Sequence, residues 1–91
     1  MDFEWDAAKA TANLAKHGVP LDLVHAFGFE AAVIRVDDRR NYGEVRWRAF
    51  GPINDRLHVL VYTIRNSSLR VISLRKANDR EFDFYERTAE E

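Results

Sequence analysis

Residues 43–76 read GEVRWRAFGPINDRLHVLVYTIRNSSLRVISLRK and carry the pattern that decides the fold. From Glu44 to Phe50, polar and apolar side chains alternate, as they do in a strand with one buried face. The run Leu57–Ile64 is β-branched and apolar on both faces, which predicts a central strand. After Asn66-Ser67-Ser68 reverses the chain, Leu69–Leu74 predicts a third strand.

The connections between these strands are short. Turns are expected at residues 37–43, 51–55 and 66–68, and none has the dozen or more residues that a parallel crossover needs. Neighbouring strands are therefore predicted to be antiparallel, with no parallel neighbours. Weak alternation from Ala31 to Val36 predicts one earlier strand, which gives a sheet of about four strands.

Two helices are predicted before the sheet. Asp6 is placed to cap a helix from Ala7 to about Lys16, and Gly18 is placed to end it in the left-handed conformation. Pro20 fits the first turn of a second helix. The apolar stripe of that helix consists of Leu21, Val24 and Phe27.

A third helix is predicted after the sheet, because Asn78 and Glu81 have the spacing of a capping box. The element order is then two helices, about four antiparallel strands and a C-terminal helix. This order is typical of an α+β fold in which the helices are segregated from the sheet. Residues 1–91 are expected to form a single domain.

The composition narrows the class of protein. Of 91 residues, 46% are hydrophobic and 32% are charged, as in a globular domain, and no stretch approaches the ~20 apolar residues of a membrane span. Met1–Trp5 has neither the basic start nor the apolar run of a secretory signal, so a cytoplasmic location is expected. The absence of cysteine excludes disulfides, cysteine zinc sites and thiol nucleophiles.

Charge is unevenly distributed along the chain. Residues 39–80 carry ten cations against three acids, whereas residues 1–38 carry three against seven and residues 81–91 carry one against five. A basic sheet between acidic flanks can attract a polyanion to one face, although strands often expose arginine to solvent without any ligand.

The sequence contains no recognisable motif for binding a metal ion or a cofactor. His17, His25 and His58 lie on three predicted elements without ligand spacing, and the sequence lacks a nucleophile elbow, a P-loop and a dinucleotide fingerprint. No metal and no cofactor are therefore expected. The remaining Arg, Lys, His, Glu and Tyr side chains suit phosphate chemistry in which a base deprotonates a hydroxyl and cations hold the developing charge.

Each candidate also has a structural explanation. Arg46 and Arg48 can simply face water, and Arg70 can pair with an acid on a neighbouring strand. Tyr62 can be a core residue, and Glu44 is either a general base or, more simply, the partner of an arginine.

The ends of two elements supply further candidates. His17 closes the first helix, where the helix dipole alone would favour an imidazolium. Arg75 and Lys76 end the third strand of the quoted stretch, so they point to opposite sides of the sheet and at least one faces whatever the sheet binds.

The chain resembles a known family, the BrnT toxins of type II toxin–antitoxin systems. The resemblance covers Phe3 to about Arg87, with one departure at Leu21, where a phenylalanine is expected. Its motifs are Phe3-Glu4-Trp5-Asp6, Lys9, Asn13, Lys16-His17-Gly18-Val19, Gly43-Glu44, Arg46, Gly51, the segment from Arg70 to Ala77, Glu81 and Tyr85.

This resemblance implies a RelE-like fold and a ribonuclease that arrests translation. It also implies a cognate antitoxin that contributes a DNA-binding domain, so that operator DNA is bound only through the complex. Carried onto this sequence, the polar signature of the family falls on Lys16, His17, Glu44, Arg46, Arg65, Arg70, Arg75 and Lys76.

The chemistry suggests roles for these residues. Arg46 and Arg75 are expected to bind the scissile phosphate without internal partners, and His17 or Glu44 is the candidate base. The expected reaction is attack by the RNA 2′-hydroxyl, which leaves a 2′,3′-cyclic phosphate and needs no metal. The expected substrate-binding residues are Lys16, Arg48, Tyr62, Arg65, Arg70 and Lys76.

Two alternatives remain open from the sequence. The first is a non-catalytic module whose basic sheet binds nucleic acid or an acidic protein. The second is a purely structural interaction protein, which the concentration of charge in residues 39–80 disfavours.

Overall fold

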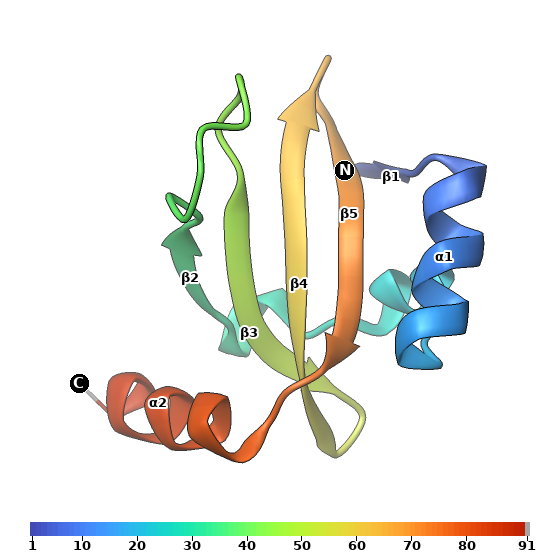
Figure 1. Cartoon of the computed structure of the whole chain (residues 1–91). Coiled ribbons are helices and arrows are strands. Elements are labelled where there is room, and N and C mark those ends of the chain that lie inside the picture. The colour runs from blue at the N-terminus through green and yellow to red at the C-terminus, as the bar shows by residue number, and fades with distance from the viewer. Residues whose placement is uncertain (91) are drawn as a thin grey trace.

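A computed structural model describes residues 1–90 and contains one five-stranded sheet with helices around it (Figure 1). The strands are β1 (Asp2–Glu4), β2 (Val33–Val36), β3 (Trp47–Ile53), β4 (Arg56–Arg65) and β5 (Ser68–Lys76). The helices are α1 (Ala7–His17), α2 (Asp79–Ala89) and two short 3-10 helices, η1 (Leu21–Ala26) and η2 (Phe29–Ala31). None of the helices in the described part of the chain has the length and hydrophobicity to cross a membrane.

Strand β4 is the centre of the sheet, whose order is β1-β5-β4-β3-β2. It pairs antiparallel with β3 and β5, and Leu57–Thr63 are all buried, which confirms the prediction of a central strand buried on both faces. The helices lie around this sheet, which confirms the α+β class.

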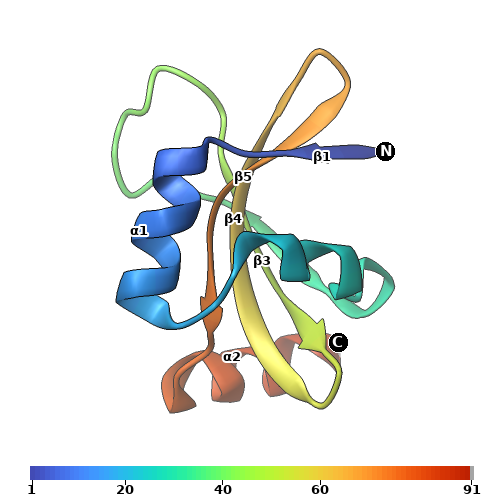
Figure 2. The ribbon, with the colours of Figure 1, turned by 90° about the vertical axis from the view of Figure 1, so that its right-hand side faces the viewer.

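The two faces of the sheet are covered by different helices (Figure 2). One face packs against η1 and its flanks through a cluster that includes Val24, Leu60 and Leu74. The opposite face, which carries Arg48, Phe50, Val59 and Arg75 and is called the α2 face below, is covered by α2 at one end only. Figure 2 shows the segment 37–46 on the side of the sheet away from η1, whereas α1 lies along the β5 edge and also contacts η1.

The expectation of a wholly antiparallel sheet of four strands is wrong, because β1 adds a fifth strand parallel to β5. Phe3 pairs with Leu69, and Glu4 pairs with Arg70. The short-turn argument applied only to consecutive strands, whereas β1 and β5 are joined by nearly the whole chain. A strand of three residues is also too short to show a period.

The second predicted helix is not an α-helix but the 3-10 helix η1, and Pro20 precedes it instead of lying in its first turn. The buried residues were nevertheless predicted correctly, since Leu21, Val24 and Phe27 are all less than 10% exposed. Their spacing of three residues matches the three residues per turn of a 3-10 helix, in which such side chains align.

Strand β3 begins later and ends later than expected. It starts at Trp47 and continues through Gly51-Pro52 to Ile53, so the turn is confined to Asn54-Asp55. Gly51 is needed inside the strand because a Cβ there would lie 2.8 Å from the ring of Phe27. Phe50, expected among the polar positions, is buried on the α2 face.

The predicted ends of both α-helices are confirmed. Asp6 accepts hydrogen bonds from Ala8 and Lys9, and Gly18 ends α1 with φ of 71°. Asn78 and Glu81 form the predicted capping box of α2. These local signals are reliable because they depend on neighbouring residues alone.

Asn13 connects α1 to the edge of β5. Its side-chain amide donates to Leu74 O at 2.7 Å and to Val19 O at 2.9 Å, and its Oδ1 accepts from Leu74 N at 3.2 Å. Since β1 pairs only with Ser68–Arg70, the amide satisfies backbone groups that β1 does not reach. This buried side chain therefore replaces a strand partner.

We expect Asn13→Ala to lower the free energy of unfolding by about 2–4 kcal/mol. The substitution leaves three buried backbone groups, Leu74 N–H, Leu74 O and Val19 O, without the hydrogen bonds that Asn13 makes. Thermal unfolding followed by circular dichroism measures this loss. Asn41→Ala, at an exposed turn, is the control and should cost less than about 1 kcal/mol. Equal losses in the two variants would contradict the bridging role.

Candidate active site on the α2 face

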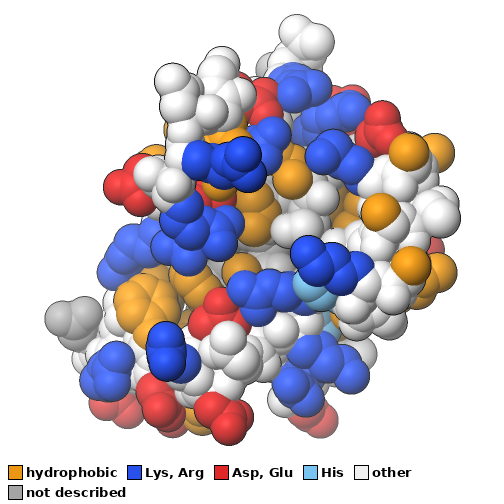
Figure 3. Space-filling view, viewed as in Figure 1, with side chains coloured by type: hydrophobic (Ala, Val, Ile, Leu, Met, Phe, Trp, Pro, Cys, Tyr) orange, Lys and Arg blue, Asp and Glu red, His pale blue; other side chains and the backbone are white. Residues whose placement is uncertain are grey.

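Arginine side chains gather on the α2 face around a hollow (Figure 3). Strand β3 supplies Arg48, and strands β4 and β5 supply Arg65, Arg70 and Arg75 by their register. Figure 1, drawn in the same orientation, shows α1 to one side of this surface, segment 37–46 to the other and α2 at one end. The structure thus collects several arginines of the basic segment on one surface.

Five arginines of this region are held by carboxylates. The pairs are Arg39–Asp37 at 2.7 Å, Arg46–Glu44 at 3.1 Å, Arg65–Glu44 at 2.8 Å, Arg70–Glu4 at 3.1 Å and Arg75–Glu81 at 2.8 Å. The expectation that Arg46 and Arg75 lack internal partners is therefore wrong. The sequence did not assign these two pairs, because Glu44 lies in a loop and Glu81 in a helix, and their placement beside Arg46 and Arg75 depends on the tertiary fold.

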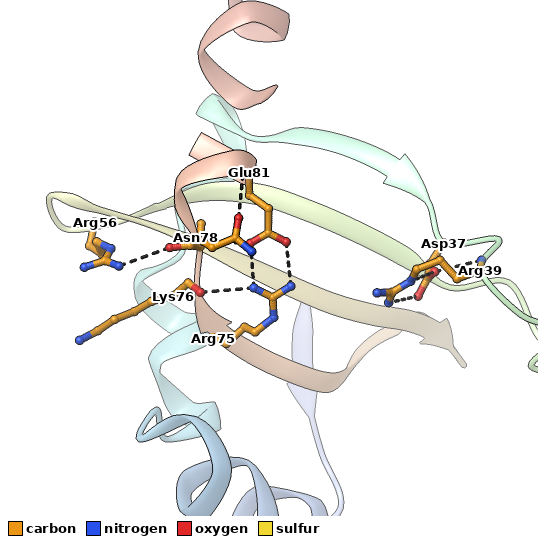
Figure 4. Close-up of polar contacts among 8 residues, drawn as sticks. Asp37, Arg39, Arg56, Arg75, Lys76, Asn78 and Glu81 are labelled. Carbon is orange, nitrogen blue, oxygen red and sulfur yellow. Dashed lines mark hydrogen bonds and ion pairs between the residues drawn. The ribbon is translucent and has the colours of Figure 1, made fainter. Parts of the chain in front are cut away.

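Arg75 is fixed by a bidentate contact with Glu81 (Figure 4). Both Nη atoms donate to the carboxylate at 2.8 Å, and Nη1 also donates to Lys76 O at 3.4 Å. Glu81 raises the pKa of Arg75, and Arg75 is the main reason that the pKa of Glu81 is lowered. A guanidinium has five N–H groups, so two remain for a ligand.

His17 ends α1 beside this arginine. It lines a small hollow of about 210 Å³ with Lys16, Ile72 and Ser73. Burial lowers the pKa of His17, and the positive charges of Lys16 and Arg75 lower it further. A lowered pKa favours the neutral imidazole, which has a nitrogen lone pair that can accept a proton.

Glu44, the other candidate base, lies at the far end of the α2 face. It is held by Arg65, and Arg65 lies six positions along β4 from Val59, the residue paired with Arg75. That offset corresponds to ~20 Å between the two arginine Cα atoms. Hydrogen bonds from Arg65 and then Arg46 lower the pKa of Glu44, which weakens it as a base.

The three histidines do not converge, since His25 lies against the ring of Phe3 and His58 is buried against Arg56 O. Within residues 1–90, no three His, Asp or Glu side chains lie close enough to hold a metal ion.

Two candidate substrate-binding residues are not on the α2 face. Tyr62 is buried on the opposite face, where its ring stacks on Trp47 and burial raises its pKa. Lys76 is paired in register with His58 and points away from Arg75 (Figure 4). The structural explanation given for Tyr62 from the sequence is thus the one that the fold supports.

Sequence reasoning missed the cluster in segment 37–46. Buried Asp37 accepts hydrogen bonds from Arg39 at 2.7 and 2.8 Å and from Tyr42 at 3.0 Å, and Arg39 is the main cause that lowers the pKa of Asp37. Arg46 lies 4.2 Å above the ring of Tyr42. The segment reads as a solvated turn, and only its aromatic residue signals that it folds onto itself.

Comparison with known proteins identifies the family of the chain. Residues 5–81 match the model of a family described as ribonuclease toxin, BrnT, of type II toxin-antitoxin system. The chain belongs to the BrnT family. It is also similar to the crystal structure of the Brucella abortus ribonuclease toxin BrnT, with a TM-score of 0.67 and 28% identity over 87% of this chain and 99% of that one. No curated protein sequence matches the chain. The resemblance read from the sequence is confirmed, and the chain is a BrnT-family ribonuclease toxin.

We expect Arg75→Ala to destabilise the fold by about 1–3 kcal/mol, between the values for exposed and buried ion pairs, because both partners are largely but not fully buried. A double-mutant cycle with Glu81→Gln, which keeps an acceptor for the Asn78 N–H, should give a coupling of about 1 kcal/mol in urea unfolding. Arg40→Ala, at an exposed position, serves as the control and should change stability by less than ~0.5 kcal/mol. Additive losses would refute the pairing.

Proposed function

We propose that this chain is a metal-independent endoribonuclease whose centre consists of Arg75 and His17. The observation that supports it is a fixed guanidinium with two unused N–H groups beside a histidine with a lowered pKa. RNA supplies the remaining group, because its 2′-hydroxyl can attack the neighbouring phosphorus.

His17 acts as the base in this proposal. It takes the proton of the 2′-hydroxyl, the new O–P bond forms, and the bond to the 5′-oxygen breaks, leaving a 2′,3′-cyclic phosphate and a 5′-hydroxyl once the leaving oxygen takes up a proton. The lowered pKa suits this task, since it favours the neutral imidazole and a base that is already protonated cannot accept the proton.

Arg75 stabilises the charge that develops on the phosphate. Glu81 holds the guanidinium in one orientation before substrate arrives, so no reorganisation is needed when charge develops. Arg39 adds positive charge nearby, because its charge acts on the pKa of Arg75.

The remaining cations serve the rest of the RNA strand. Arg46, Arg65 and Arg70 lie toward the other end of the α2 face and contact flanking phosphates, while Lys16 lies beside His17. Glu44 positions Arg46 and Arg65 in this arrangement, and it remains the alternative base.

The family also supports a protein partner. A cognate antitoxin with a DNA-binding domain would neutralise the chain by covering the α2 face with an acidic surface, and operator DNA would be bound only through that complex. The excess of cations on this face supplies the electrostatic complementarity.

We expect purified protein to cut single-stranded RNA in excess EDTA. His17→Ala should lower the rate by about two to four orders of magnitude while RNA binding persists. His25→Ala, which removes a histidine from the other side of the sheet, is the matched control and should keep the wild-type rate. Denaturing gels of a labelled RNA give the rates and the cyclic phosphate end.

The pH dependence provides a second readout of the same assay. The wild-type rate should rise with pH through a midpoint below the ordinary histidine value of about 6.5, because the pKa of His17 is lowered. If His17→Ala cuts normally and Glu44→Gln does not, Glu44 is the base. Binding of RNA without any cutting would favour the non-catalytic module instead, and activity that requires a divalent ion would refute the mechanism.

Expression of the chain alone should stop bacterial growth, and Arg75→Ala should relieve the arrest. Growth curves after induction measure this, with immunoblots to show equal protein levels. Because Arg75→Ala also costs stability, Arg56→Ala, which removes a hydrogen bond to Ala77 O and lies outside the proposed site, is the folding control and should remain toxic. Harmless accumulation of wild-type protein would contradict the toxin function.

A further inference from the structure

We infer that the groove between β2, β3 and α2 binds one nucleotide of single-stranded RNA, next to the centre at Arg75. This inference deepens the proposed function and rests on it. The groove has a volume of about 580 Å³. Its walls are formed chiefly by Arg35, Val36, Arg48, Phe50, Arg80 and Phe84.

The arginines of the groove differ from the paired ones described above. Among residues 1–90, no carboxylate lies within ion-pair distance of Arg35, Arg48 or Arg80. The acid that lines the groove, Glu81, is already engaged by Arg75 and by the Asn78 N–H. The groove therefore carries positive charge that the described fold does not neutralise.

Arg48 provides an independent observation. Its Nε is buried and has no hydrogen-bond partner within the described residues. A buried donor without a partner costs about 1–3 kcal/mol, and such groups are rare in folded proteins. A bound acceptor such as a phosphate oxygen removes this cost, so the donor indicates a ligand.

The groove also has an aromatic wall. The guanidinium of Arg48 lies 5.6 Å from the ring centre of Phe50, and that of Arg35 lies 5.8 Å from the ring centre of Phe84. The two rings themselves meet edge to face at 5.1 Å. Cations beside aromatic rings bind both parts of a nucleotide, since phosphate pairs with guanidinium and a base stacks on planar groups.

The location ties the groove to the proposed centre. Glu81 lines the groove and holds Arg75, so the two sites share a wall. An RNA strand whose scissile phosphate lies at Arg75 can therefore place a neighbouring nucleotide in the groove. An acidic protein side chain can form ion pairs with the arginines of the groove but cannot stack on its aromatic rings. A nucleotide can do both, so it is the favoured ligand.

The test uses a fluorescent, uncleavable 2′-O-methyl RNA oligonucleotide as probe. Arg48→Ala and Arg80→Ala should each weaken binding about tenfold, as expected for loss of one charge-assisted hydrogen bond, and should lower the salt slope by about 0.7. Arg87→Ala is the matched control, because it removes an arginine from the last turn of α2, outside the groove. Its affinity should stay within twofold of wild type. Arg80 is exposed, so its variant remains folded even if Arg48→Ala does not.

Cleavage kinetics separate the groove from the centre. The two groove variants should raise KM with kcat nearly unchanged, whereas Arg75→Ala lowers kcat. If the wild type binds through the groove but does not cut RNA, the catalytic proposal fails and the groove is supported. If the wild type cuts RNA and the groove variants bind and cut normally, the groove inference is overturned.

Two competitors identify the ligand. A nucleoside monophosphate should displace the probe at lower concentration than inorganic phosphate, and equal potency would overturn the role of the aromatic wall. A poly-glutamate peptide tests the protein alternative. If Arg48→Ala and Arg80→Ala lose the peptide while retaining the probe, the groove takes an acidic protein and the nucleotide inference is wrong.

Discussion

Burial of β4 on both faces is the constraint on which the rest of the structure depends. Its run Leu57–Thr63 has side chains on each side of the sheet, so the chain must supply two covering layers. The η1 side is covered extensively, with Val24 fully buried, whereas α2 covers only the end of its face through Phe84. The uncovered remainder of the α2 face is where the arginines gather.

Pairing orients these arginines more than it stabilises the domain. Exposed ion pairs contribute about 0–1 kcal/mol each, which is small compared with burial of the β4 side chains. Their effect is to hold cations in fixed positions before a ligand arrives. Arg35, Arg48 and Arg80 differ from them, because no carboxylate among the described residues lies within ion-pair distance of these three side chains.

Local patterns predicted most of the fold, and the failures are non-local. The helix caps and the buried strand depend on neighbouring residues, so they could be predicted. β1 could not, because three residues have no measurable period and their pairing with Ser68–Arg70 is set by the path of the whole chain. The type of η1 was missed because a stripe at every third residue fits both α- and 3-10 helices over so short a length.

The candidate site was predicted in residue types and only partly in partners: the pairing of Arg70 with an acid on a neighbouring strand and of Glu44 with an arginine was predicted, whereas the partner of Arg75 was not. On a strand that is apolar on both faces, alternation cannot tell which side faces the ligand, so Tyr62 was placed with the cations although it lies in the opposite layer. The Arg75–Glu81 pair joins a strand end to a helix start, and its formation depends on the turn at Ala77-Asn78. Sequence spacing alone does not determine that turn.

Glu81 has two tasks, since the same carboxylate completes the capping box of α2 and clamps Arg75. Protein synthesis therefore produces the cation six positions before the group that fixes it. While the chain is emerging from a ribosome, Arg75 can complete β5 yet remain free to rotate until the first turn of α2 has formed. The order of translation thus delays assembly of the proposed centre until after the sheet has been synthesised, and a nascent chain that ends before Glu81 lacks the fixed guanidinium.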